Sequence, residues 1–251
     1  MLKIISNWPD AIPTEEVSKL QRFCLEQELA LTLEWLEGQY WLHSDEKGEL
    51  PIGIQVDQTL ERHLQYFKKS SLHKEQLARA LGIKGSYRPQ VLDLTAGLLG
   101  DSLLFLSMGC KVTALERHPV VAFLIKSALE NAHHPLLNHL QFQEADAQTY
   151  LKEATSIPEV IYFDPMFEDV NDKALPKKEM RIFRSLLGQD RDAVSVLETA
   201  LKRSPKRLVV KRPRLSKYLR EGIPLTYVGK STRYDVYLGQ NHGPNDSNQI
   251  K

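Results

Sequence analysis

A carboxylate and a proline directly follow a short apolar run: V-I-Y-F at residues 160–163 leads into Asp164-Pro165-Met166-Phe167. The Asp164 carboxylate and the Pro165 carbonyl can each accept a hydrogen bond from an NH₂ group, and the Phe167 ring offers a flat face to a planar partner. Because the lone pair of an aromatic amine is delocalised, such acceptors would orient it and stabilise the positive charge developing on nitrogen. These three residues are therefore the candidate catalytic groups for chemistry on an exocyclic amine.

The position of this tetrapeptide in the chain decides whether it is a structural turn or part of a binding site. An isolated D-P-x-F is more often a turn that ends a strand, with its aromatic residue in the core. Here it follows the fourth of a series of strands, where α/β proteins place their ligands. It also resembles the (D/N)-P-P-(Y/F) signature of methyltransferases that modify exocyclic amines, with Met166 replacing the second proline.

A second group of polar residues surrounds a glycine turn. The strand-like run at residues 91–94 contains Asp93 and leads to Gly97, and Asp101 opens the following helix. Glycine lets the backbone approach a cofactor closely. The turn lacks the G-x-G-x-x-G spacing that cradles a pyrophosphate, and two carboxylates would repel that group. Asp93, Gly97 and Asp101 therefore favour a cationic cofactor, S-adenosylmethionine, over a nicotinamide dinucleotide.

Two later strand ends support this cofactor. Glu116 ends the second strand, 19 residues after Gly97, where it can accept hydrogen bonds from ribose hydroxyls. Asp146 follows the third strand and can meet the exocyclic amine of adenine, with Ala147 lining the pocket. Each strand-end acid alone is more often a loop or capping residue. Together, in one βαβαβ series, they predict an S-adenosylmethionine site.

Two basic clusters lie near the same strand ends. Lys177, Lys178 and Arg181 open a helix after the acceptor tetrapeptide, and Lys211 and Arg212 end the fifth strand. A base must leave its stack to enter an active site, and the phosphates beside it need cationic partners. Taken alone, such clusters are more often solvated surface. They agree with an RNA-binding role but are not sufficient to predict it.

The elements that must position these residues alternate from residue 90 onward. Strands are expected at 91–94, 111–116, 140–143, 160–163, 208–211, 226–229 and 235–238, and helices at 101–108, 119–132, 148–153, 178–187 and 192–203. Alternating strands and helices form a mostly parallel sheet covered on both faces. The last two strands are close enough to form an antiparallel hairpin. The expected fold is α/β, a Rossmann-like seven-stranded sheet with an antiparallel terminal hairpin.

The first 80 residues follow another pattern and predict a small α+β lobe with linking helices. A helix is expected at 17–27, extended segments at 29–35, 40–42 and 52–56, and helices at 57–67 and 73–81. Residues 81–240 then form the methyltransferase domain, and residues 241–251 a polar tail.

Composition narrows the class of protein. Of the 251 residues, 42% are hydrophobic and 26% charged, and the net charge is +1, which is typical of a globular protein. No apolar run could cross a bilayer, the first ten residues lack the apolar core of a secretory signal, and Cys24 and Cys110 show no zinc-binding spacing. We expect a cytoplasmic protein with no metal, no membrane contact and no obligate protein partner.

Several segments resemble the ribosomal RNA small subunit methyltransferase J family. The similarity covers roughly residues 80–240 and is most specific where D-P-M-F precedes K-K-E-M-R. The matching stretches are Gly82–Tyr87, Asp93–Leu98, Gly109–Ala122, Tyr162–Phe167, Lys177–Phe183, Val209–Pro213 and Arg233–Tyr237. Met166 fits this family.

This resemblance implies methyl transfer from S-adenosylmethionine to N2 of a guanine in 16S ribosomal RNA, with S-adenosylhomocysteine as product. The implied partner is small-subunit ribosomal RNA or the 30S subunit. The implied cofactor contacts are Gly100, Asp101, Glu116, Arg117, Asp146, Ala147 and Asp164.

Three other functions stay open at the level of sequence. The nearest is an amino-methyltransferase acting on another RNA base or on DNA. The second is a non-catalytic RNA-binding protein of ribosome assembly that keeps the fold, although Asp164 and Glu116 argue against it. The third is a dehydrogenase, which bound nicotinamide would reveal.

Overall fold

The computed structural model describes residues 2–5, 14–36, 38–44, 50–166, 186, 190–222 and 225–239. The chain forms two compact units. The smaller contains Met1–Val56, His118–His133 and Met166–Gln189, and the larger contains Asp57–Arg117, His134–Pro165 and Asp190–Lys251. Among the described residues, no helix is long and apolar enough to cross a membrane. The division into residues 1–80, 81–240 and 241–251 stays a prediction.

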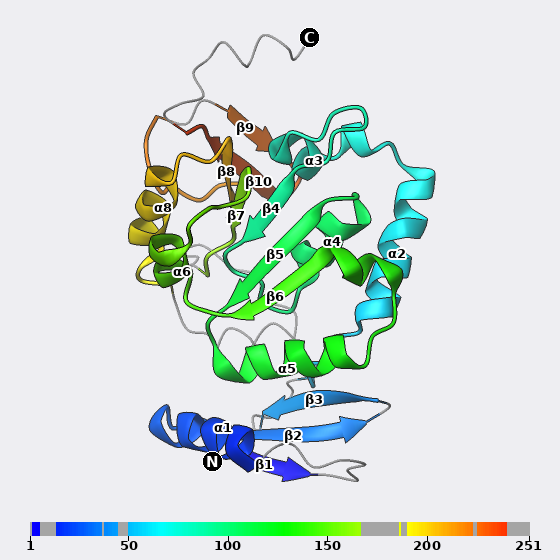
Figure 1. Cartoon of the computed structure of the whole chain (residues 1–251), viewed down its shortest axis with the longest axis vertical. Helices are drawn as coiled ribbons and strands as arrows, with labels where there is room; N and C mark the ends of the chain where they lie inside the picture. Colours follow the sequence, from blue (N-terminus) through cyan, green and yellow to red (C-terminus); the bar gives the residue numbers. More distant parts are fainter. Residues whose placement is uncertain are drawn as a thin grey trace. The chain divides into compact units, whose positions relative to one another are not determined.

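The larger unit is built on a seven-stranded sheet in the order β6-β5-β4-β7-β8-β10-β9 (Figure 1). Its strands are β4 (Gln90–Asp93), β5 (Lys111–Glu116), β6 (Leu140–Glu144), β7 (Val160–Phe163), β8 (Arg207–Pro213), β9 (Leu225–Val228) and β10 (Thr232–Tyr237). Neighbouring strands from β6 to β8 are parallel, and β10 is antiparallel to both β8 and β9. The predicted sheet with its terminal hairpin is confirmed, with β9 at the edge.

The central strands are apolar because both faces of the sheet are covered. Val91 lies opposite Val112 in β5 and Val160 in β7, and all three are buried. Strands covered on both faces have continuous apolar runs, which explains the V-I-Y-F sequence of β7. The ring of Tyr162 meets that of Phe105 edge-on, 4.8 Å between centroids.

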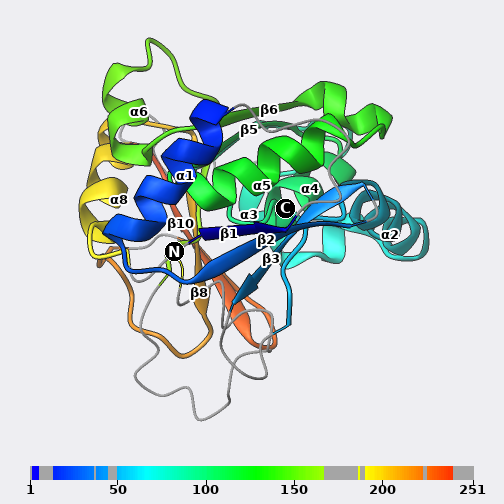
Figure 2. The same ribbon diagram turned by 90° about the horizontal axis from the view of Figure 1, so that it is seen from below.

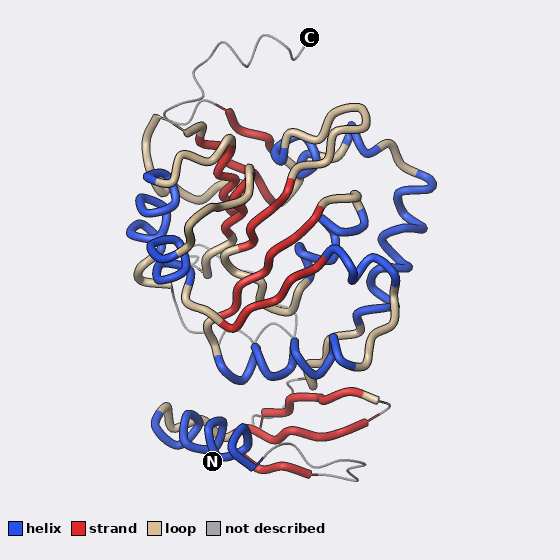
Figure 3. Tube along the Cα trace, viewed as in Figure 1, coloured by secondary structure: helices blue, strands red, loops and turns tan. Residues whose placement is uncertain are grey.

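Helices surround this sheet (Figure 3). They are α2 (Val56–Lys69), α3 (Gln76–Leu81), α4 (Gly100–Ser107), α6 (Ala147–Glu153) and α8 (Ala193–Lys202), with 3₁₀ turns at Leu72–Lys74 and Pro135–His139. Helix α6 packs on α8, α4 on β5, and α3 on β9 and β10. Gly82 ends α3 in the left-handed conformation at φ +79°, as its sequence position predicts.

In its described residues, the smaller unit combines a three-stranded sheet with helices (Figures 1 and 2). The elements are β1 (Leu2–Ile5), α1 (Thr14–Glu26), β2 (Leu31–Leu36), β3 (Gln39–Ser44) and α5 (Pro119–Glu130). Strand β2 pairs parallel with β1 and antiparallel with β3. Leu20, Leu33 and Leu42 are fully buried in its core.

Three local expectations differ from the structure. Strand β1 was not expected. Of the segment expected to be extended at 52–56, only Ile52 pairs, in a single bridge with Leu42, and Val56 already begins α2. Gly53 packs so closely on Trp41 that an added Cβ would lie 2.8 Å from the ring. The helix expected at 73–81 is interrupted at Glu75, whose backbone is extended.

Two expectations lie largely or wholly outside the described residues. They are the helix at 178–187, of which only Leu186 is described, and the tail at 241–251.

Candidate active site

The acceptor residue Asp164 lies at the carboxyl end of β7, beside the turn that follows β4. The Asp164 backbone N–H donates to Thr95 Oγ1 at 2.8 Å, and the Leu94 N–H donates to the Tyr162 carbonyl at 2.9 Å. Strands β4 and β7 are parallel neighbours, so their carboxyl ends meet. The fold thus brings Asp164 to Thr95 in the glycine turn, 69 residues away in sequence.

A single ammonium group joins two of the predicted site carboxylates. Lys211 Nζ lies 2.7 Å from Asp101 Oδ2 and 2.9 Å from Asp164 Oδ2. The Tyr162 hydroxyl also donates to Asp101 Oδ2, at 2.6 Å. Tyr234 lies opposite Lys211 in the β8–β10 register. These contacts draw the ends of β7 and β8 and the start of α4 into one cluster.

Burial and charge set the protonation of this cluster. Burial, with the negative charge of Asp101, raises the pKa of Asp164 to about 6, although Lys211 opposes the shift. Burial alone would lower the pKa of Lys211, but the two carboxylates raise it well above its usual value. At neutral pH Asp164 is therefore mostly ionised and pairs with the Lys211 ammonium group. The side chain of Asp164 keeps 37% of its surface exposed, so a substrate amine can reach it.

Asp93 lies beneath the glycine turn. It is 1% exposed; its Oδ1 accepts from the Thr95 N–H at 3.1 Å and its Oδ2 from the Ser102 hydroxyl at 2.6 Å. Burial raises the pKa of Asp93 to about 7. Both oxygens thus hold the turn and α4 in place, and the cofactor contact assigned to Asp93 stays a prediction.

Glu116 also supports the turn. Its Oε2 accepts from the Gly97 N–H at 3.0 Å, and the Ala96 N–H donates to the Leu115 carbonyl at 2.9 Å. Gly97 and Leu99 both have positive φ, 53° and 62°, so the turn curls back over the end of β5. Gly100 opens α4, where an added Cβ would meet nothing within 4 Å.

Arg117 and Asp146 meet at the ends of β5 and β6. Arg117 Nη1 lies 3.7 Å from Asp146 Oδ2 and 2.7 Å from Asp192 Oδ2, and Arg117 Nη2 also contacts Asp190. Asp146 Oδ1 accepts from the Thr149 N–H at 2.9 Å, which caps α6 and places the buried Ala147 in its first turn. This group sits next to the end of β5, where Glu116 holds the glycine turn.

Lys211 and Arg212, the two basic residues predicted to bind RNA from β8, have different surroundings. Lys211 points into the carboxylate cluster. Arg212 is buried, and its Nη2 donates to the Lys217 carbonyl at 2.9 Å. Adjacent residues of a strand point to opposite faces, which explains the split. That both contact RNA phosphates stays a prediction.

The structure describes only some of the remaining predicted site residues. Pro165 is buried behind Asp164. Phe167, Lys177, Lys178 and Arg181 lie outside the described residues. Within the described part of the chain, no group of three or more His, Cys, Asp or Glu could hold a metal ion.

The sequence reasoning missed five polar residues of this site: Thr95, Tyr162, Asp190, Asp192 and Tyr234. Thr95 could have been noticed, because it lies inside the glycine turn. The other four join the site through contacts between strands and helices far apart in sequence, for which the sequence gives no spacing signal.

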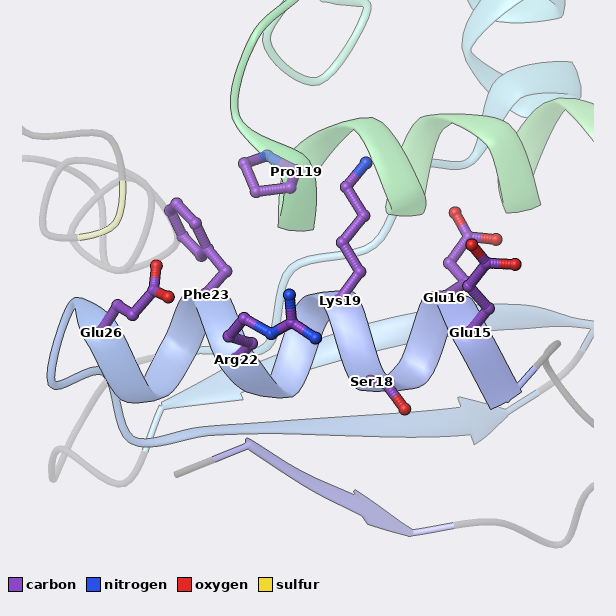
Figure 4. A pocket seen from close by; sticks show the side chains of 8 residues that line it. All are labelled: Glu15, Glu16, Ser18, Lys19, Arg22, Phe23, Glu26 and Pro119. Carbon is purple, nitrogen blue, oxygen red and sulfur yellow. The ribbon is translucent and has the colours of Figure 1, made fainter.

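A hollow of about 670 Å³ lies in the smaller unit, between α1 and the first residue of α5 (Figure 4). It is lined by Glu15, Glu16, Ser18, Lys19, Arg22, Phe23, Glu26 and Pro119. Its charges are mixed and it contains none of the predicted site residues. The carboxyl edge of the larger sheet is therefore the candidate active site.

The chain is similar to known proteins over most of its length. The model of a family described as putative SAM-dependent methyltransferase matches residues 17–239. The ribosomal RNA small subunit methyltransferase J of Thioalkalivibrio sulfidiphilus is 45% identical over 76% of this chain and 78% of that protein. The protein of the same name from Coxiella burnetii is 45% identical over 64% of this chain and 65% of that one.

A solved structure covers nearly the whole chain. The SAM-dependent methyltransferase from Neisseria gonorrhoeae aligns over 97% of this chain and 98% of its own, with a TM-score of 0.68 and 27% identity. The likeness includes the region before residue 80, which the sequence resemblance left uncovered.

Proposed function

The chain belongs to the family of SAM-dependent methyltransferases, and from this premise we propose that it methylates the exocyclic N2 of a guanine in 16S ribosomal RNA. The observation that carries the proposal is the position of Asp164. Its carboxylate is partly exposed at the end of β7 and is held by Lys211 and Thr95. The relatives named ribosomal RNA small subunit methyltransferase J support the choice of substrate.

The acceptor amine needs orientation more than deprotonation. Asp164 and the Pro165 carbonyl each accept a hydrogen bond from the NH₂ group, which directs the nitrogen lone pair away from the ring and stabilises charge developing on nitrogen. The Phe167 ring stacks on the base. After transfer, the amine loses its extra proton to water.

Several carboxylates of the site fit S-adenosylmethionine. When bound, this cofactor supplies a methyl group on a cationic sulfur and leaves as S-adenosylhomocysteine, so the reaction needs no metal. With the cofactor bound, Glu116 would accept from the ribose hydroxyls and Asp146 from the adenine amine, with Ala147, Gly97 and Gly100 shaping the pocket. Asp101 favours the cation electrostatically, and Asp93 supports the glycine turn that would approach it.

Lys211 keeps Asp164 ionised in this scheme. Asp101 and Asp164 would repel each other as neighbouring carboxylates, and the ammonium between them offsets the repulsion. Arg117, at the end of β5, links Asp146 after β6 to Asp190 and Asp192 before α8 by its ion pairs. The substrate is small-subunit ribosomal RNA, as free RNA or in the 30S subunit, which places the activity in the cytoplasm.

The test is methyl transfer from radiolabelled S-adenosylmethionine to small-subunit RNA and to 30S particles from a strain that lacks the enzyme. We expect labelled N2-methylguanosine after digestion. Label on an adenine, a cytosine or DNA would move the protein to another amino-methyltransferase class. Absence of label, with cofactor binding shown separately, would favour the non-catalytic assembly role.

A further inference from the structure

Residues 214–222, the described part of the segment between β8 and β9, combine exposed basic side chains with exposed hydrophobic and aromatic ones. Arg214, Leu215, Lys217, Tyr218 and Arg220 are all exposed, with Leu215 94% and Tyr218 55% exposed. We call this segment the β8–β9 loop. Because β8 is parallel to β7, the loop leaves the sheet at the edge where Asp164 lies.

The backbone of this loop is held by a buried arginine. Arg233 is 5% exposed and pairs with Asp235 at 3.0 Å. Its Nη1 donates to the carbonyls of Arg214, at 3.0 Å, and Ser216, at 2.7 Å. A buried charge is costly unless it is paired and hydrogen-bonded, and here its partners include the loop backbone. The loop conformation is thus tied to the interior.

Two further buried side chains extend this support. Arg212 donates to the Lys217 carbonyl at 2.9 Å, and the Tyr237 hydroxyl donates to the Arg220 carbonyl at 3.2 Å. Three interior side chains, counting Arg233, thus fix four loop carbonyls. With the carbonyls turned inward, the basic side chains of the loop point outward. Little conformational entropy is then lost when a ligand binds.

The side chain of Tyr218 packs on the same buried arginine, Arg233. The Arg233 guanidinium stacks on its ring, 4.1 Å from the centroid, and fixes one face. Over half of the side chain is still exposed, so the other face is open to a planar partner. Aromatic faces between cations are how proteins bind single-stranded nucleic acid.

We propose that the β8–β9 loop is a preorganised platform for unpaired RNA beside the target base. The outer face of Tyr218 stacks on a neighbouring base, and Arg214 and Lys217 contact the phosphates next to it. Arg220 contributes less, because its Nε lies 3.4 Å from Glu198 Oε1. The identity of the ligand as RNA rests on the proposed function, whereas the shape and charge of the platform do not.

The charge of the platform is tested with the double variant Arg214→Gln/Lys217→Gln. Binding of a short, fluorescein-labelled, unpaired oligoribonucleotide is measured by anisotropy over a series of KCl concentrations. Two lost phosphate contacts reduce the slope of log affinity against log salt by about 1.4. The matched control is Lys111→Gln/Lys202→Gln. It makes the same charge change at exposed positions, at the start of β5 and at the end of the helix α8 that leads into β8.

The stacking surface is tested with Tyr218→Leu against Tyr218→Phe. Leucine covers Arg233 but has no aromatic face, and we expect binding at least about fivefold weaker. Phenylalanine keeps the face and should bind like the wild type. Each variant is also titrated with S-adenosylmethionine by calorimetry, and unchanged affinity shows that the fold and cofactor site are intact.

The outcomes separate this inference from the proposed function. If the wild type methylates guanine but the loop variants bind RNA with unchanged affinity and salt slope, the platform is refuted and the function stands. If RNA binding depends on the loop but no methyl transfer to small-subunit RNA occurs, the platform stands and the function fails. Equal losses in the control pair would also refute the platform, because they would indicate a general charge effect.

Discussion

The Lys211 ammonium contacts the two carboxylates on which the proposed chemistry depends. It lies within 2.9 Å of Asp164 and 2.7 Å of Asp101. The Lys211 cation lowers the pKa of Asp164, whereas burial and the negative charge of Asp101 raise it. For Asp164 the balance gives a pKa of about 6, which leaves it ionised at neutral pH and sensitive to changes nearby.

Asp164→Ala should abolish methyl transfer while leaving the protein folded. Loss of one well-placed acceptor lowers kcat by about 100-fold or more, and the partly exposed side chain contributes little to packing. Single-turnover transfer to small-subunit RNA measures the effect, with cofactor affinity and circular dichroism as controls. Near-normal activity would remove Asp164 from the mechanism.

Lys211→Met should shift the acidic limb of the pH–rate profile to higher pH. Transfer by the wild type should fall as the pH drops below about 6, because Asp164 becomes protonated. Without the ammonium, the pKa of Asp164 rises further, so the loss begins at higher pH. The measurement is kcat against pH.

Lys211→Arg is the matched control, because it keeps the charge and should keep most of the wild-type profile. A role limited to phosphate contact predicts a different result for Lys211→Met. RNA affinity would then fall while the acidic limb stayed in place, and that outcome would contradict the positioning role.

At the scale of elements, the ends of helices and strands set the site. Helix α3 ends at Gly82, and Arg207 of β8 donates to the last carbonyls of the helix, with Nη1 3.2 Å from the Ala80 oxygen. This contact holds the connection into β4, the strand that leads to the glycine turn. Strand β8 carries Arg207 at its start and Lys211 near its end. It therefore contacts both the end of α3 and the carboxylates of the candidate active site.

Gly82→Ala should destabilise the protein by roughly 1–2 kcal/mol, because its φ of +79° is unfavourable for alanine. The added Cβ would also lie 2.8 Å from Arg207 Nε. Gly100→Ala is the control, since its Cβ meets nothing within 4 Å and alanine favours the helix. Urea unfolding compares the two. Equal effects would show that the α3 cap does not depend on glycine.

At the scale of the whole molecule, buried carboxylates make stability depend on pH. Burial raises the pKa of Asp93 from 3.8 to about 7, so the folded protein binds more protons than the unfolded chain between these values. The free energy of unfolding should therefore fall as pH rises from about 4 to 7 and level off above. Asp164 contributes in the same direction.

Asp93→Asn should remove the Asp93 part of this dependence. The amide can still accept from the Thr95 N–H and can donate to the Ser102 oxygen, so the turn keeps its contacts. We expect the variant to gain up to about 4 kcal/mol over the wild type at pH 8 and almost nothing at pH 4. The free energy of unfolding is measured by urea titration of both proteins at pH 4 and at pH 8. A gain in stability that does not depend on pH would contradict the raised pKa of Asp93.

The sequence by itself determined the elements and the order of the site residues along the chain. Apolar runs such as that of β7, the glycine at the end of α3 and the acids at the ends of β5 and β7 are local signals, because propensity, capping and burial act over a few residues. Together with the family resemblance, they predicted a mostly parallel sheet, and the structure shows it. They also predicted that the cofactor and acceptor residues share one edge, since parallel strands end together.

Only the tertiary structure decided which of those residues touch. The Lys211 contact with Asp101 spans 110 positions and that of Arg117 with Asp192 spans 75, and no spacing rule reaches so far. Folding also turned Asp93 and Glu116 toward the turn and divided the β8 cations, with Lys211 in the cluster and Arg212 beneath the loop. The physical reason is that strand order and the alternation of side chains across a strand fix these contacts, and both depend on the packed sheet.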